Sequence, residues 1–386
     1  MKKKTVKKNS GSVSATETAK STKAGGMRFC ASVKGKNVAR EDVGSQRGKG
    51  EILPLLKLKR HKCIRVFEGF AGYGGATFGM RRAGIKHEVV GYSEFDKFAS
   101  ALYDANFKDK KGNPLKNWGD ITKIDPSELP DFDMFTGGFP CQPFSSVGMQ
   151  KGEGDPYGRG TLLHEILRIC SVKKPKYIFL ENVKGLTAKK FEGLFNVLKT
   201  WLRDNGYGEL KYVVLNTLDY GIPQNRERLW MFARLGGLPE DFSMVPPKRP
   251  YTKRLKDYLD ATPPPELYLS QAQIKRLKEF YGIPSFIVKE PSCFDLYNRK
   301  IRTDGTCITI LAPEHNKLRL VEVPKADGLE VVRKFSVTEQ FRLMGFKDGE
   351  IDFAGQSYSQ LSKRAANGWD VNLVGILLNH IFNQLF

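Results

Sequence analysis

The chain has 386 residues, 40% of them hydrophobic, which suffices for a large core and two or three domains, and its net charge of +21 indicates a polyanionic partner. Six widely spaced cysteines without a Cys-x-x-Cys pair argue against a zinc cluster or a disulfide framework and favour a reducing, intracellular setting. No apolar run reaches the roughly 18 residues of a membrane-spanning helix, and no apolar stretch follows the Lys-rich start, so we expect neither a membrane protein nor a secreted one.

Residues 1–60 form a basic, polar segment with almost no large apolar side chain before Ile52. The first 50 residues carry 13 Lys and Arg against 3 Asp and Glu, a net +10, and the other 336 residues contribute +11. Because such a segment cannot bury enough surface to fold, we predict that it is disordered. Two interpretations stay open: an arm that binds phosphates, or a leader that only solubilises the chain.

The first folded unit predicted from the sequence is a buried strand at 63–67, a glycine-rich turn at 68–75 and a helix at 76–83. A GxGxxG loop would need glycine in place of Thr77, and no Walker lysine follows, so a dinucleotide is disfavoured. A second strand at 88–92 leads to Glu94, about twenty residues past the glycines, where Rossmann-like folds place an acid on the ribose hydroxyls. The alternative for Glu94 is a solvated acid at the start of a helix.

An apolar strand at 132–135 leads into Gly137 and Gly138, and two prolines then flank Cys141. A core strand would not break in this way, because prolines on both sides of the thiol remove ladder hydrogen bonds. A nucleophilic cysteine needs partial exposure and stiff backbone, which glycines and prolines provide. The pattern favours a displayed nucleophile over a buried structural cysteine.

The stretch 137–145, GGFPCQPFS, resembles the nucleophile loop of the cytosine carbon-5 DNA methyltransferases, and further family motifs follow in order from about residue 64 to the C-terminus. The resemblance implies an α/β fold of the class I methyltransferase type, a Rossmann-like, mostly parallel sheet with a second, smaller target-recognition domain. It implies a catalytic domain at 61–235, a recognition domain with a bracing helix at 236–364, and a C-terminal helix at 365–386 that returns to the catalytic domain.

The cofactor implied by the resemblance is S-adenosyl-L-methionine, with no metal. The glycine-rich turn is similar to the family's FxGxGG, and Asp120 matches the residue that accepts from the adenine amino group. Many members have Gly-Asn-Ser/Ala-Val in the last motif, whereas this chain has Ala366 and Trp369 there, and the tryptophan resembles the de novo vertebrate enzymes. The residues expected at the cofactor are Phe70, Gly72, Gly74, Glu94, Phe95, Asp120, Ile121, Gly138, Pro140, Leu162, Asn367 and Trp369.

Glu181 ends an apolar strand at 177–183, where an ionisable group is costly unless it has a purpose. A carboxyl in such a site tends to keep its proton and can donate it to nitrogen 3 of cytosine, the role that the family's ENV motif also implies. Arg226 and Arg228 lie on one face if their segment is a strand, and we expect them to hold a phosphate and the carbonyl of the base and to lower the pKa of the Cys141 thiol.

Strand–helix alternation stops after Gly236, and proline-rich loops and short strands indicate the second domain. Residues 302–310 resemble the family's Thr-Leu element with Ile310 in place of the leucine, and residues 333–346 resemble the family's ninth motif, a capped bracing helix. A loop at 149–159, rich in glycine and charge, is expected to close over the target nucleotide. The expected DNA contacts are Gln142, Ser145 and Thr309.

The resulting prediction is a DNA cytosine-5 methyltransferase that flips its target base and forms a covalent adduct through Cys141. The expected partner is double-stranded DNA, and a cognate restriction endonuclease is a possible second partner. We expect the enzyme to be a monomer in the cytoplasm, associated with the nucleoid. Three alternatives were weighed: an RNA (tRNA) cytosine methyltransferase of the same fold, a catalytically silent nucleic-acid scaffold, and a nicotinamide oxidoreductase, against which the missing third glycine speaks.

Overall fold

The computed structural model describes residues 55–140, 162–249, 251–312, 318–324 and 326–386. Cys141, Gln142, Ser145 and the expected lid at 149–159 lie outside the described residues, as does nearly all of the expected basic tail.

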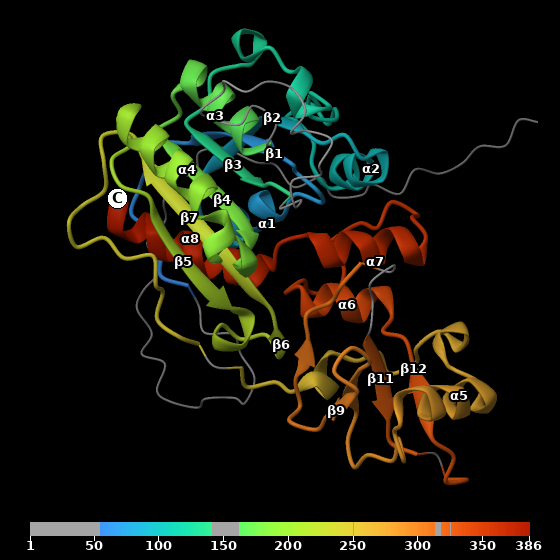
Figure 1. The fold of residues 1–386 in the computed structure, drawn as a ribbon. Coiled ribbons are helices and arrows are strands. Elements are labelled where there is room, and N and C mark those ends of the chain that lie inside the picture. The colour runs from blue at the N-terminus through green and yellow to red at the C-terminus, as the bar shows by residue number, and fades with distance from the viewer. Residues whose placement is uncertain (1–54, 141–161, 250, 313–317, 325) are drawn as a thin grey trace, which may run out of the picture. The chain divides into compact units, whose positions relative to one another are not determined.

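A six-stranded sheet forms the centre of the larger part of the fold (Figure 1). Its strand order is β2-β1-β3-β4-β7-β5; the first four strands pair in parallel, and β7 runs antiparallel to both of its neighbours. This mostly parallel sheet confirms the predicted α/β class. The strands are β1 (Ile64–Gly69), β2 (His87–Ser93), β3 (Met134–Gly138), β4 (Tyr177–Val183), β5 (Lys211–Asn216) and β7 (Glu227–Arg234).

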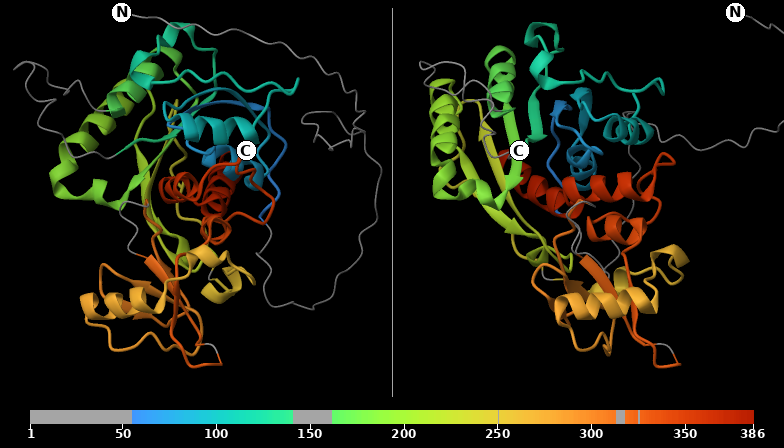
Figure 2. Two further views of the ribbon diagram at one scale, coloured as in Figure 1. Left: turned by 90° about the vertical axis from the view of Figure 1, so that its right-hand side faces the viewer. Right: turned by 45° about the vertical axis from the view of Figure 1, so that its right-hand side comes forward.

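Side chains alternate along each strand between two apolar cores, one on each face of the sheet. On β4, Phe179 joins the core beneath α1 (Gly75–Ala83) and α8 (Val371–Leu385), whereas Leu180 joins the core on the opposite face. That opposite core is covered by α3 (Leu162–Lys173) and α4 (Glu192–Asp204), drawn in green on one side of the sheet in Figure 2. By the same alternation Glu181 faces the side of α1 and α8.

Helices α1 and α8 pack closely because glycines lie in their interface. A Cβ added to Gly79 would lie 2.2 Å from the Val374 side chain, so no larger residue fits there without a shift. At the end of α1, the carbonyl of Ala83 accepts a hydrogen bond from the Asn379 amide of α8 (3.0 Å). The two helices, far apart in sequence, thus cover one face of the sheet together.

The predicted elements of this part occur close to their expected positions. The strand predicted at 88–92 is β2, and the one predicted at 132–135 begins two residues later and continues through Gly138 as β3. The helix opened by Glu94 and its neighbours is α2 (Lys97–Asn106), which Asp96 caps by accepting from the N–H groups of Phe98 and Ala99.

A second, antiparallel sheet follows residue 290, with the strand order β12-β11-β8-β9. One of its faces packs against α5 (Gln271–Tyr281), a helix that we did not predict in this region although Ser270 and Gln273 form a capping box at its start. The sheet confirms a second, smaller unit of the fold. Its strands are β8 (Ser292–Asp295), β9 (Lys300–Arg302), β11 (Leu318–Glu322) and β12 (Val331–Arg333).

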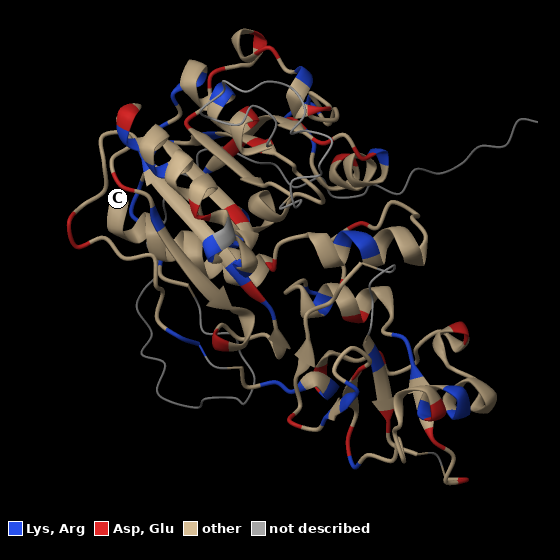
Figure 3. Ribbon diagram, in the orientation of Figure 1, with Lys and Arg blue, Asp and Glu red and all other residues tan. Residues whose placement is uncertain are grey.

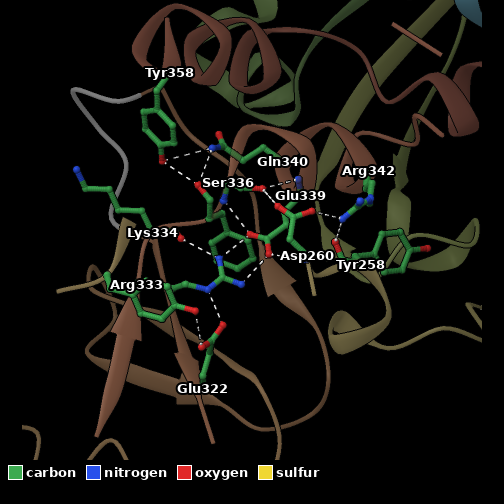
Figure 4. A network of polar contacts seen from close by, with 12 residues as sticks. Tyr258, Asp260, Glu322, Arg333, Lys334, Ser336, Glu339, Gln340, Arg342 and Tyr358 are labelled. Carbon is green, nitrogen blue, oxygen red and sulfur yellow. Dashed lines mark hydrogen bonds and ion pairs between the residues drawn. The ribbon is translucent and has the colours of Figure 1, made fainter. Parts of the chain in front are cut away.

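A buried polar network connects the second sheet to α6 (Val337–Leu343) and is drawn in Figure 4. Arg333, fully buried at the end of β12, donates to both carboxylate oxygens of Glu339 (2.8 and 2.6 Å) and to Glu322 (2.5 Å). Ser336 and Glu339 form the capping box of α6, which confirms the predicted capped helix. Because each buried charge has an ionic partner, the network can remain in a dry environment.

The two sheets are also joined by a short parallel pairing of β6 (Gln224–Asn225) with β10 (Cys307–Ile308). Beyond it, α7 (Tyr358–Asn367) leads to the loop that precedes α8. Figure 3 shows Lys and Arg interspersed with Asp and Glu over both parts, and several are paired, such as Arg364 with Asp96 (2.9 Å). Among the helices described, none is both long and apolar enough to cross a membrane.

Candidate active site

The glycine-rich turn between β1 and α1 adopts backbone conformations that favour glycine. Gly72 and Gly74 have φ values of 57° and 85°, and Phe70 shares this left-handed region. A Cβ at Gly74 would lie 2.2 Å from the Phe107 ring, so a side chain there is excluded by contact as well as by strain. Gly74 is the N-cap of α1 and supplies no side-chain cap, so the turn presents backbone rather than side chains at this helix start.

Glu94 follows β2 and is tied to the glycine-rich turn. Its carboxylate accepts from the N–H of Gly72 and from the N–H of Asp96, both at 2.9 Å, and burial raises its pKa. Because Asp96 is the residue that caps α2, the alternative role of Glu94 as the acid at this helix start is not what the geometry shows. Beside it Phe95 is 80% exposed, which leaves a large aromatic face open for stacking.

Asp120 lies near Glu94, in the segment after the chain passes the edge of β2. The Ser93 hydroxyl donates to the carbonyl of Gly119 (2.7 Å) and holds this segment against the strand. Hydrogen bonds from the N–H and hydroxyl of Thr122 lower the pKa of Asp120, so its carboxylate is an acceptor at neutral pH. Ile121 is buried in an apolar cluster against which Phe70 and Leu162 also pack.

Glu181 lies at the carboxyl end of β4 and is only 8% exposed. Its Oε1 is 3.1 Å from Nε of Arg228, and its Oε2 accepts from the indole N–H of Trp369 (3.1 Å). Burial raises the pKa of Glu181, and Arg228, Arg226 and the Trp369 hydrogen bond oppose this rise. The carboxyl is thus held in a site where a proton is favoured more than in water.

The strand that leads to Cys141 lies directly beside Glu181. Gly138 of β3 pairs with Glu181 of β4, and a Cβ at Gly138 would lie 2.8 Å from Glu181 Oε2. The carbonyl of Phe139 accepts from the Asn182 amide (2.9 Å), which holds the backbone just before the nucleophile loop. The description of this segment ends at the exposed Pro140, one residue before Cys141.

Arg226 lies in the break between β6 and β7, outside a regular strand, whereas Arg228 lies on β7, and their guanidinium groups have different environments. Arg226 is only 1% exposed and donates to the carbonyls of Ala366 (2.8 Å) and Gly368 (2.7 Å), with a longer contact to Ile310 (3.4 Å). Burial and the neighbouring Arg228 lower the pKa of Arg226 to about 9. Its two terminal nitrogens thus donate to backbone carbonyls, its Nε has no partner among the described residues, and of the two arginines Arg228 is the one paired with Glu181.

Gln224, in the same motif, is a residue that the sequence analysis did not single out. It is fully buried, its amide donates to the carbonyl of Leu343 (2.7 Å), and its oxygen accepts from the N–H of Ile310 (3.0 Å). Thr309 makes a parallel contact through its hydroxyl to the carbonyl of Asn225 (2.7 Å). No periodicity marks Gln224 as an organising residue, because the partners of its side chain come from distant segments.

The last motif places Trp369 beside Glu181, and contact of Asn367 or Trp369 with the cofactor stays a prediction. Trp369 is buried between α1 and β3, whereas Asn367 is exposed at the end of α7. A Cβ at Gly75 would lie 2.9 Å from the Trp369 side chain, so this glycine makes room for the indole. Within the described residues no group of three or more His, Cys, Asp and Glu could hold a metal ion.

Comparison with known proteins agrees with this geometry. The profile of the C-5 cytosine-specific DNA methylase family matches residues 64–383. The type II methyltransferase M2.ScrFI of Lactococcus lactis subsp. cremoris is 32% identical over 374 residues, which cover 84% of this chain and 99% of that protein. M.HaeII of Haemophilus aegyptius is 33% identical over 334 residues, which cover 85% of this chain and 95% of M.HaeII.

A solved structure shows the same fold at lower sequence identity. The Schizosaccharomyces pombe Dnmt2 methyltransferase superimposes with a TM-score of 0.64 at 21% identity and covers 84% of this chain and 99% of its own. At this identity the likeness concerns the fold alone. With the family profile spanning both sheets and the two type II relatives matched almost end to end, the chain belongs to the family of C-5 cytosine-specific DNA methylases.

Proposed function

We propose that this protein transfers a methyl group from S-adenosyl-L-methionine to carbon 5 of cytosine within a specific sequence of duplex DNA. The observation that carries the proposal is the position of Glu181. Its carboxyl is buried at a strand end, contacts Arg228, and lies beside Gly138, three residues before Cys141. A proton donor and a cation at this end of the sheet, with a cysteine three residues further along the chain from Gly138, are the groups that addition to a pyrimidine ring requires.

S-adenosyl-L-methionine, which supplies an electrophilic methyl group when bound, fits the residues at the ends of β1 and β2. Glu94 uses part of its acceptor capacity on two backbone N–H groups, and a carboxylate keeps further lone pairs for ribose hydroxyls. Asp120 accepts from the adenine amino group, and the exposed ring of Phe95 stacks on the base. The turn at Gly72 and Gly74 lets backbone approach the methionine part.

In the chemical step, the Cys141 thiolate adds to carbon 6 of cytosine while Glu181 passes a proton to nitrogen 3. The resulting enamine makes carbon 5 nucleophilic enough to accept the methyl group. Loss of the carbon-5 proton to a base then expels the cysteine, and the proton on nitrogen 3 returns to Glu181. The target must leave the base stack for a thiol to reach it, as in other enzymes that modify a base in duplex DNA.

Arg228 and Arg226 have separate roles in this proposal. Arg228 contacts the carbonyl of the base and keeps a positive field near the thiol, because its guanidinium already lies at the carboxylate that faces the ring. Arg226 holds the backbone at Ala366 and Gly368 in place from its buried position. A direct contact of Arg226 with DNA phosphate would require these hydrogen bonds to break.

Sequence reading is assigned to residues 236–364, and contacts to the flipped strand are assigned to Gln142, Ser145 and Thr309. We further propose that the enzyme acts as a monomer in the cytoplasm at the nucleoid. The type II names of both relatives support a modification role opposite a cognate restriction endonuclease. Bisulfite sequencing of DNA from a host that expresses the chain identifies the methylated sequence.

The test uses DNA with 5-fluorocytosine at the target, where fluorine cannot leave as the proton does. We expect this DNA to accept the methyl group and remain attached to the protein through denaturing electrophoresis, and Cys141→Ser to abolish the adduct while cofactor binding persists. Tritiated methyl transfer to matched DNA and tRNA runs in parallel. Label in tRNA alone would establish the RNA enzyme, and no label in either substrate would establish a silent scaffold.

A further inference from the structure

The contact between Trp369 and Glu181 is held in place by the packing around both side chains. The indole N–H donates to Glu181 Oε2 at 3.1 Å, and both side chains are buried. The ring is fixed by edge-to-face contacts with Phe179 (5.7 Å) and Trp230 (5.1 Å), and the Trp369 carbonyl accepts from the Tyr73 hydroxyl. An indole so enclosed cannot turn its N–H elsewhere without repacking the core.

Glycines on two other elements make room for this tryptophan. A Cβ at Gly75 would lie 2.9 Å from Trp369 Cβ, and a Cβ at Gly138 would lie 2.7 Å from the indole Nε1. A Cβ at Gly368, the preceding residue, would lie 1.9 Å from the Tyr73 ring. Gly75 of α1 and Gly138 of β3 therefore leave room for the indole, and Gly368 leaves room for Tyr73, whose hydroxyl holds the Trp369 carbonyl.

The two carboxyl oxygens of Glu181 consequently have different hydrogen-bond partners. An indole N–H only donates, so the oxygen that it contacts must act as an acceptor and cannot direct a proton toward it. The other oxygen, Oε1, faces Arg228, whose side chain is partly accessible. A guanidinium has no acceptor either, so a proton on Oε1 must point away from Arg228, and the ion pair between them weakens.

We propose that Trp369 is a positioning residue that reserves Oε2 of Glu181 as an acceptor, so that the proton given to nitrogen 3 of cytosine is carried on Oε1. This inference rests on the proposed function. Protonation of Oε1 weakens its ion pair with Nε of Arg228, which can then donate to the carbonyl of the same base while Nη1 stays on the carbonyl of Glu227 (2.8 Å). The indole N–H thus determines which oxygen of Glu181 carries the proton, and the protonation of that oxygen determines whether Arg228 can donate to the base.

The experiment removes the N–H and keeps the ring. In Trp369→Phe the donor and part of the ring are lost, and replacement of Trp369 by benzothienylalanine, whose sulfur takes the place of the N–H, removes the donor alone. Trp230→Phe is the matched control, because Trp230 lies in the same cluster and its Nε1 has no hydrogen-bond partner among the described residues. Single-turnover methyl transfer is measured from pH 5 to pH 9 with saturating cofactor.

Loss of a hydrogen bond to the ionised carboxyl should move the basic limb of the rate profile about one pH unit higher in both Trp369 variants. At pH values below this limb, the rate of both Trp369 variants should be about tenfold lower than that of wild type, because the carboxyl is no longer oriented. The affinity for the cofactor should stay within about twofold of wild type. Trp230→Phe should leave the limb unchanged. An unshifted limb in the benzothienylalanine protein, or an equal shift in Trp230→Phe, would overturn the proposal.

A second measurement separates this inference from the proposed function. Infrared titration of the protein without cofactor or DNA, with the Glu181→Gln spectrum subtracted, reports ionisation of this carboxyl directly. We expect the same upward displacement of about one pH unit in the benzothienylalanine protein. If the titration is displaced in the benzothienylalanine protein but wild type transfers no methyl group, only the proposed function is refuted. If wild type is active but the titration of the benzothienylalanine protein is not displaced, the role of Trp369 is refuted.

Discussion

Glu68 is a second buried carboxyl, and its environment makes a quantitative prediction about stability. It lies on β1 with only 2% of its surface exposed, and it accepts hydrogen bonds from the hydroxyls of Thr77 and Tyr103 (3.2 Å to Tyr103). Burial raises its pKa from an ordinary value of 4.5 to about 7, an effect larger than the opposing one of these hydrogen bonds. The folded protein therefore holds a proton here that the unfolded chain gives up at lower pH.

The direction in which pH changes the free energy of unfolding follows from proton linkage. Because the folded pKa is the higher one, the associated stability is fully present below pH 4.5 and is lost as the pH rises to about 7. The shift corresponds to about 3 kcal/mol between the two limits. Glu68→Gln keeps the shape and an acceptor oxygen but does not ionise, so it should be nearly neutral at pH 4 and stabilise by roughly 3 kcal/mol at pH 8.

The assay is urea unfolding of wild type and Glu68→Gln at pH 5, 6.5 and 8, without cofactor or DNA. The difference in the free energy of unfolding should grow by about 2.5 kcal/mol from pH 5 to pH 8. Taking the difference between the two proteins cancels the titration of all other groups. A difference that stays constant over this range would show that Glu68 is ionised in the folded protein at pH 5 and that the reasoning is wrong.

Three further predictions concern the arginine pair, the basic tail and the second sheet. Arg226→Met should lower the free energy of unfolding by about 3 kcal/mol, because buried carbonyls lose their donor. Arg228→Met should change the free energy of unfolding little and slow single-turnover methyl transfer at least 10²-fold. Equal unfolding midpoints of the two variants would contradict these separate roles. Deletion of residues 1–50, with their net +10, should flatten the salt dependence of DNA affinity and leave turnover intact, and an unchanged slope would exclude a phosphate-binding arm. Exchange of residues 240–325 for the matching part of a relative should change the methylated sequence but retain methyl transfer, as read by bisulfite sequencing; an unchanged sequence would refute the recognition assignment.

The parts of the fold that sequence predicted are those with local causes. The apolar run and the glycines after it predict β1 within two residues at each end, the turn at Gly72 and Gly74, and α1 within one residue. Glu181 stands out because a charge at the end of an apolar strand is anomalous from the sequence itself. Each of these signals is carried by a few neighbouring residues, so one chain is enough to read it.

The parts that sequence did not predict depend on distant partners. From the sequence Arg226 is expected to hold a phosphate or the base carbonyl, and only the structure shows that it donates to the carbonyls of Ala366 and Gly368, about 140 positions away. The hydrogen bond from the Trp369 N–H to Glu181, 188 positions away, likewise could not be predicted from the sequence. The α5 helix was missed because the proline-rich segments and short strands around it outweighed the capping box at Ser270.

The packing of α8 on α1 has a consequence for how the chain folds. Ala83 and Asn379 are hydrogen-bonded although 296 positions separate them, and Gly79 contacts Val374 in the same interface. The loop closure needed for such contacts is slow, so the β1–α1 unit that carries the glycine-rich turn must wait for the other end of the domain. Until α8 docks, the apolar face of α1 is open to other chains, and this first unit is where aggregation during refolding should begin.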